Sequence, residues 1–170
     1  MQGTEGKEMN YRGSSLSVPE RIFAALPYTI SLMAGIPAIL LLAQFLPNVP
    51  IVEVLAPLLF IPFSLTRFLG PYANLIIFFG LFFFVVRNTD IKQFIRFHTM
   101  QSLMIGIAVS VTGLMGDLLG PTMAMFSALL SIVVSAAVVV VSIYSMILAL
   151  MGNYTNIPLL SEASEAQTRY

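Results

Sequence analysis

The residues that could perform chemistry are few in this chain and lie far apart along it. His98 is the single histidine and cysteine is absent, which excludes paired-histidine and thiolate metal sites, disulfides and a cysteine nucleophile. A serine–histidine–aspartate arrangement would need Asp117 near His98, but they are about 28 Å apart along one expected helix. Glu53 and Asp117 could form a carboxylate dyad only if the folded chain places them side by side. We therefore expect no catalytic residue, no metal, no cofactor and no enzymatic activity.

Four long apolar stretches must position these residues, and they cover residues 22–46, 68–86, 97–119 and 125–150. Charged residues make up 9% of the chain and the mean hydropathy is +0.91, whereas about a quarter of a soluble domain is charged. Each stretch is near the ~20 residues that a helix needs to cross a bilayer, where every backbone amide must be satisfied internally. These features predict an all-α polytopic membrane protein with four transmembrane helices.

The expected organisation is a polar N-terminal tail (1–20), a membrane domain (21–152) and a C-terminal tail (153–170). The first apolar stretch is too long for a cleaved signal peptide and is interpreted as an uncleaved signal-anchor helix, kinked by Pro27, Gly35 and Pro37. Between the first two helices, prolines divide residues 47–71 into apolar pieces too short to span. This pattern predicts an interfacial or re-entrant segment.

Basic residues are distributed unevenly over the loops of this topology. Seven of the eight Lys and Arg residues fall in the two tails and the loop between the second and third helices, and Arg67 alone falls on the other side. The asymmetry predicts that both termini face the cytoplasm or stroma. In that loop, Thr89 or Asp90 is expected to cap the third helix. Arg87, Lys92 and Arg96 are interpreted mainly as solvated anchors at anionic headgroups.

Two rows of small residues, each with a spacing of four, occur in the third and fourth helices. They are Ser102, Gly106 and Ser110 in the third helix, and Ser127, Ser131 and Ser135 in the fourth. Small residues let helices approach closely in lipid, so we expect both rows to face protein and to pack helices together.

Polar side chains within the apolar stretches are expensive in lipid and are often functional. Asn74, His98 and Gln101 are of this kind. Hydrogen bonding between helices or snorkelling is the ordinary explanation, and it is favoured for His98, which lies near a helix end. Gln101 lies deeper and is the better candidate for facing protein or a water-filled path.

One segment, residues 87–101, resembles the signature of the Tic-twenty family. That family includes the small membrane subunit of the translocon at the inner chloroplast envelope and its cyanobacterial relatives. The residues that carry the resemblance are Arg87, Asn88, Arg96, Phe97, His98, Met100 and Gln101. Residues 21–28, 85–88 and 157–163 agree as well, and the similarity extends over about residues 19–166. The family usually has asparagine where this chain has His98.

The resemblance implies a four-helix membrane protein with a role in protein translocation, as a channel or a channel-associated subunit. The alternatives are a small-solute or proton-coupled carrier that uses Glu53, Asp117 and Gln101, and a structural assembly factor. Expected partners are the lipid bilayer, other membrane subunits or further copies of the chain, and a translocating polypeptide; nucleic acid is not expected. Because residues 1–20 do not resemble a transit peptide, the expected location is a cyanobacterial plasma membrane, or the plastid inner envelope for a plastid-encoded or mature form.

Overall fold

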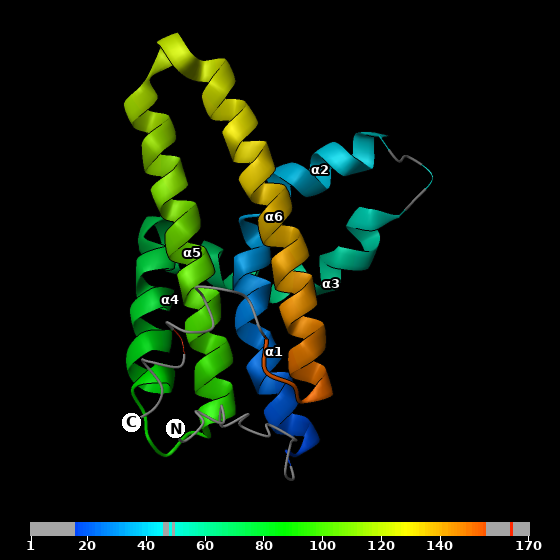
Figure 1. Ribbon diagram of the computed structural model, residues 1–170, viewed down its shortest axis with the longest axis vertical. Coiled ribbons are helices and arrows are strands. Elements are labelled where there is room, and N and C mark those ends of the chain that lie inside the picture. Colours follow the sequence, from blue (N-terminus) through cyan, green and yellow to red (C-terminus); the bar gives the residue numbers. More distant parts are fainter. Residues whose placement is uncertain (1–15, 46–47, 49, 156–163, 165–170) are drawn as a thin grey trace, which may run out of the picture.

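The computed structural model describes residues 16–45, 48, 50–155 and 164 of the chain. The helices of this part are α1 (Val18–Met33), α2 (Ile36–Phe45), α3 (Ile51–Leu69), α4 (Ala73–Leu81), α5 (Gln93–Leu119) and α6 (Ala124–Met151), and Figure 1 shows their arrangement. Short helical turns join several of them: Gly70–Tyr72, the π-helical turn Phe82–Val86, and Pro121–Met123. The described residues contain no strand, which confirms the all-α class.

Three of these helical segments are long and apolar enough to cross a membrane, namely Ile51–Val86, Gln93–Leu119 and Pro121–Met151. A fourth span results if α1 and α2, which meet at a bend of 72°, are counted as one. The prediction of a polytopic membrane protein with four spans is therefore confirmed by length and composition, with a broken helix as the first span.

The core of the bundle is formed by α1, which packs against both α5 and α6, while α4 and its π-helical turn lie along α5. Figure 1 shows that α1 begins, α5 begins and α6 ends at the same end of the bundle. The α5–α6 hairpin extends beyond the other helices at the opposite end. The buried residues consequently concentrate in the half of the bundle where α1 is present.

The break between α1 and α2 lies at Gly35, and α1 runs unbroken through Pro27. Pro27 therefore does not break the first helix, and a kink at this residue stays a prediction. Pro37 is the second residue of α2, a position where a helix needs no backbone N–H, so it favours a new helix start rather than a kink. A Cβ atom added to Gly35 would collide with Val139 Cγ2 of α6. Only glycine allows the bent backbone to approach α6 this closely.

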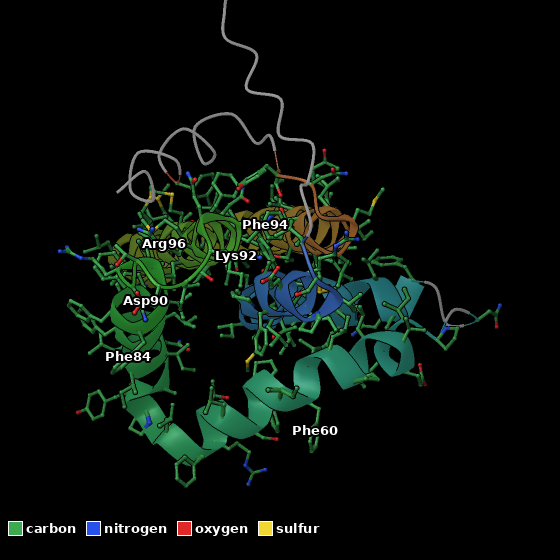
Figure 2. All side chains as sticks on the ribbon, turned by 90° about the horizontal axis from the view of Figure 1, so that it is seen from below. Phe60, Phe84, Asp90, Lys92, Phe94 and Arg96 are labelled. Carbon is green, nitrogen blue, oxygen red and sulfur yellow. The ribbon has the colours of Figure 1, made fainter. Side chains whose placement is uncertain are left out.

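The proline-rich segment between the first two spans forms one continuous helix rather than the short pieces expected from its sequence. Pro50 precedes α3, and Pro57 and Pro62 lie inside it. Each internal proline removes one hydrogen bond, and the neighbouring bonds hold the helix together. Figure 2 shows α3 lengthwise where α1, α5 and α6 are seen end-on, with Phe60 pointing outward. This crosswise orientation agrees with the predicted interfacial or re-entrant segment.

The third span begins later than its sequence suggested, because α5 starts at Gln93 and Lys92 is its N-cap residue. The expectation that Thr89 or Asp90 caps this helix is wrong. The side-chain oxygen of Asn88 instead accepts a hydrogen bond from the Asp90 N–H at 3.0 Å. Asn88 and Asp90 therefore form a local turn before α5 and do not cap the helix.

Gly35→Ala tests the close contact at the bend. We expect the variant to lose about 1–3 kcal/mol of unfolding free energy, because its methyl group must displace Val139. Reversible unfolding in mixed detergent micelles would measure the loss. Gly113→Ala is the matched control, because no atom lies within 4 Å of a Cβ at that position. Val139→Ala should restore part of the loss in the double variant; equal stability of both glycine variants would contradict the close contact.

Candidate functional site

The part of the signature segment that lies in α5 is buried from Arg96 onward. All residues from Arg96 to Leu103 are buried, and His98 and Gln101 have no exposed surface. A helix that is buried all round must be surrounded by other elements. Here α1, the turn after α4, α6 and the residues that follow α6 surround it.

Tyr28 of α1 joins the polar side chains of this segment. Its hydroxyl lies 2.9 Å from His98 Nδ1 and 2.7 Å from Gln101 Oε1. His98 Nε2 lies 3.2 Å from the backbone carbonyl oxygen of Asn153, just after α6. One side chain of α5 thus connects α1 to the end of α6, and we name Tyr28, His98 and Gln101 the tyrosine–histidine–glutamine cluster.

A second polar contact between α1 and α5 lies about one helical turn along. The Ser102 hydroxyl donates to the Pro27 carbonyl oxygen at 2.7 Å and lies 2.8 Å from the Ser31 hydroxyl. Small side chains with hydroxyl groups allow helices to approach closely and to bond across the interface. Ser102, which was predicted to pack helices, therefore packs against α1.

Aromatic rings also surround His98. Phe94, Phe97 and Tyr154 have ring centroids 4.6, 5.4 and 6.2 Å from that of His98. Phe94 also packs with Ala24 of α1 and Ala149 of α6, and Figure 2 shows it at this end of the bundle. The cluster is consequently sealed by apolar surface, which strengthens its hydrogen bonds and makes unpaired polar atoms costly.

Arg96 does not act as the solvated anchor that its sequence position suggested. Its side chain is 6% exposed, and its Nε donates to the Val86 carbonyl oxygen at 2.8 Å. Val86 ends the π-helical turn, so Arg96 satisfies a carbonyl at the end of the second span. Arg87 and Lys92 are exposed, and Lys92 forms an ion pair with Glu20 of α1 at 2.7 Å.

The remaining residues of the two small-residue rows lie in different surroundings. Gly106 is partly buried, with no atom within 4 Å of an added Cβ, and the exposed Ser110 donates to its carbonyl oxygen at 3.0 Å. Ser127 lies beside Gly116, where an added Cβ would be 2.8 Å from its hydroxyl. Ser131 is exposed and Ser135 is buried. Within the described chain the rows therefore do not pack against each other along their length.

A different row of residues forms the buried face of α6, and Ser135 is its one member that the sequence predicted to pack. Its members are Ser135, Val138, Ser142, Ser145 and Ala149. Their spacing alternates between three and four, the pattern that keeps one face of a helix against a partner, whereas the sequence analysis used a spacing of four alone. Tyr28 was also missed, although a tyrosine in the middle of an apolar stretch is a signal of a buried hydrogen bond.

The other polar residues considered from the sequence do not join the cluster. Asn74, Glu53 and Asp117 are all exposed. The described residues contain no group of three His, Asp or Glu side chains that could hold a metal ion. The buried site is therefore built from neutral hydroxyl, amide and imidazole groups, which suit interhelical bonding.

The buried signature residues lie inside the helical bundle and not at an open cleft. The chain is therefore a small polytopic membrane protein with a polar core. Residues 14–164 match the family model described as "Chloroplast import apparatus Tic20-like", and the chain belongs to this family.

Several curated relatives share this similarity. A Tic20 family protein of Synechocystis is 30% identical over 161 residues, which cover 89% of this chain and 94% of the relative. The Tic20 family protein Ycf60 of Pyropia yezoensis is 27% identical over 175 residues, covering 95% and 81% of the two chains. Protein TIC 20-II, chloroplastic, of Arabidopsis thaliana is 39% identical over 51 residues, which cover 30% and 24%.

Arg96→Lys tests the role of the buried guanidinium. Lysine keeps the charge but lacks the Nε–H that the Val86 carbonyl accepts. We expect a loss of about 1–3 kcal/mol in unfolding free energy, measured by reversible unfolding in mixed micelles. Arg87→Lys is the control because Arg87 is exposed, and it should change stability by less than about 0.5 kcal/mol. Similar small effects for both substitutions would mean that Arg96 contributes no more than a surface charge.

Proposed function

We propose that this protein is a non-enzymatic subunit of a protein-translocating membrane complex, as a channel or channel-associated component similar to the plastid inner-envelope import translocon. The observation that carries the proposal is the family match, which extends over residues 14–164 and so includes every described helix. The buried signature supports it, because Arg96, His98 and Gln101 bond to neighbouring helices and not to an open ligand site.

The carrier alternative receives less support from the geometry. Glu53 and Asp117 are exposed at the beginning of α3 and the end of α5, and Gln101 is closed inside the bundle. A carrier normally places ionisable groups near the membrane midplane, facing a cavity. The same separation of carboxylates argues for a protein without catalytic activity.

A subunit of this size requires partners if it is to move a polypeptide. Three or four spans are too few to enclose a pore of polypeptide width. The α5–α6 hairpin offers surface for a partner, because Leu118 is 87% and Met125 80% exposed. At 1.5 Å per residue α5 is about 40 Å long, whereas the hydrocarbon core of a bilayer is about 30 Å thick. We therefore propose that membrane subunits or further copies of the chain cover this part of the hairpin.

The proposed orientation places the polar cluster near the cytoplasmic or stromal face. The beginning of α1 and the end of α6 lie at one end of the bundle (Figure 1), together with the loop that carries Arg87 and Lys92. Basic residues favour the cytoplasmic side of a membrane. The membrane itself is proposed to be the cyanobacterial plasma membrane or the plastid inner envelope.

Gly106→Leu distinguishes a packing face for a partner from a face covered by lipid. Since no atom lies within 4 Å of a Cβ at Gly106, the isolated chain should accept leucine with unchanged unfolding free energy. If a partner helix packs there, the larger side chain should reduce the size of detergent-solubilised complexes, and Gly106→Ala should have little effect. Gly80→Leu in α4, another open position, is the control. Complexes of wild-type size in Gly106→Leu would assign this face to lipid.

Photo-crosslinking in native membranes tests the translocation role directly. We expect a photoreactive residue at Leu118 to crosslink to a membrane subunit or, with a precursor arrested in transit, to that precursor. The control position is Phe84, which is 77% exposed and points away from the bundle (Figure 2); it should crosslink mainly to lipid. Lipid adducts alone at both positions, with an arrested precursor present, would contradict the proposed role.

A further inference from the structure

The hydrogen bonds around His98 impose a constraint on its protons. A neutral imidazole carries one N–H, so one nitrogen donates and the other accepts. Nε2 lies 3.2 Å from the Asn153 carbonyl oxygen, which can only accept, so Nε2 must carry the hydrogen. Nδ1 must then accept, and its partner at 2.9 Å is the Tyr28 hydroxyl. Neutral His98 thus requires the Tyr28 hydrogen.

The Tyr28 hydroxyl has a single hydrogen, yet its oxygen also lies 2.7 Å from Gln101 Oε1. If the hydrogen points to His98, two oxygens face each other without a hydrogen between them. A half-turn of the Gln101 amide exchanges its oxygen and nitrogen. Gln101 Nε2 then donates to the Tyr28 oxygen, and every contact in the cluster has one donor and one acceptor.

The same half-turn changes which atom of the Gln101 amide lacks a partner. With Oε1 toward Tyr28, the buried Nε2 donor has no hydrogen-bond partner. After the turn the atom without a partner is an acceptor and no longer a donor. Ser145 and Thr155 lie beside the Tyr28 hydroxyl. For a neutral His98, the contacts that join Tyr28, His98 and Gln101 therefore match donors to acceptors only with the turned amide.

In the other amide orientation the contacts that join Tyr28, His98 and Gln101 match donors to acceptors for a His98 that carries both hydrogens, while Gln101 Nε2 has no hydrogen-bond partner. Nδ1–H then donates to the Tyr28 oxygen, the Tyr28 hydroxyl donates to Gln101 Oε1, and Nε2–H still donates to Asn153. The side chains keep the same positions in the two arrangements. The arrangements differ by one proton and by the orientation of one amide.

The groups that face His98 come from three elements. Tyr28 and Arg21 belong to α1. The Arg21 guanidinium lies near the end of α6, beside Gly152 and next to Asn153. Tyr154 stacks on the ring from the segment after α6. On α5 the neighbours Phe94 and Phe97 are neutral, and Arg96 bonds to Val86. The ion pair recorded among the described residues, Glu20 with Lys92, does not include His98.

We propose that Tyr28, His98 and Gln101 form a proton-binding site inside the bundle, with two hydrogen-bonded states that differ in the orientation of the Gln101 amide. Binding forms one N–H bond at Nδ1 and breaks one O–H bond of a hydronium ion in the solvent. The Tyr28 hydrogen turns from His98 to Gln101, and the amide makes a half-turn. Asn153, whose carbonyl oxygen holds the ring through Nε2, is an exposed residue. Since the three partners join α1, α5 and the end of α6, proton binding changes the contact at which these elements meet.

The single histidine makes the site directly observable. The full chain, labelled with ¹⁵N in histidine and in glutamine side chains and embedded in lipid nanodiscs, would be titrated by NMR. At high pH we expect the Nε2–H form with an unprotonated Nδ1. On acidification both nitrogens should become protonated, and the Gln101 amide signal should change with the same midpoint. An Nδ1–H form at high pH, a His98 that never titrates while the protein is folded, or a titration without a change at Gln101 would each overturn the proposal.

Two variants separate this role from a purely structural one. His98→Asn keeps an amide oxygen as an acceptor toward Tyr28 but cannot take up a proton, so the pH response of Gln101 should be lost while the protein folds. Tyr28→Phe removes the shared hydroxyl and should uncouple Gln101 from the His98 titration. Tyr144→Phe, at an exposed tyrosine, is the control and should titrate like the wild type. A Gln101 amide that keeps its pH response in His98→Asn would assign that response to another group.

Discussion

The interhelical hydrogen bonds of Tyr28 are the interaction on which this structure depends. A membrane bundle gains little from the hydrophobic effect between its helices, because lipid is as apolar as the side chains. Buried polar groups therefore specify which helix faces meet. One hydroxyl on α1 bonds to His98 and Gln101 of the signature segment, and His98 carries the connection to the end of α6.

Close packing surrounds this polar contact and makes it possible. Gly35 brings the α1–α2 bend against Val139, and the serine and alanine side chains on the buried face of α6 leave room for α1. Ser102 and Ser31 bond where α1 and α5 touch. Small residues thus set the distance between helices, while Tyr28 and its partners set their register. The hairpin beyond α1 has a small-residue contact between Gly116 and Ser127 but no bond to Tyr28, and large side chains such as Leu118 are exposed there.

The signature residues divide into structural roles that their order in the sequence does not reveal. Arg96 secures the end of the second span through Val86, whereas Arg87, nine positions earlier in the same motif, is exposed. His98 and Gln101 lie on the face toward Tyr28. Several signature residues of this protein consequently bond α5 to its neighbours, which is consistent with a subunit that acts through assembly.

The sequence by itself determined that the chain is helical, lies in a membrane, and has an interfacial or re-entrant segment between its first two spans. These properties follow from local hydropathy and from the rule that backbone groups in lipid must bond within their own helix. Hydropathy does not specify how each helix is rotated about its axis. Only the tertiary structure decided that Tyr28 meets His98 across 70 positions of sequence, that Arg96 turns inward, and that the buried face of α6 begins at Ser135 and excludes Ser131. Those outcomes depend on which distant polar groups satisfy one another, and that pairing exists only once the helices have packed.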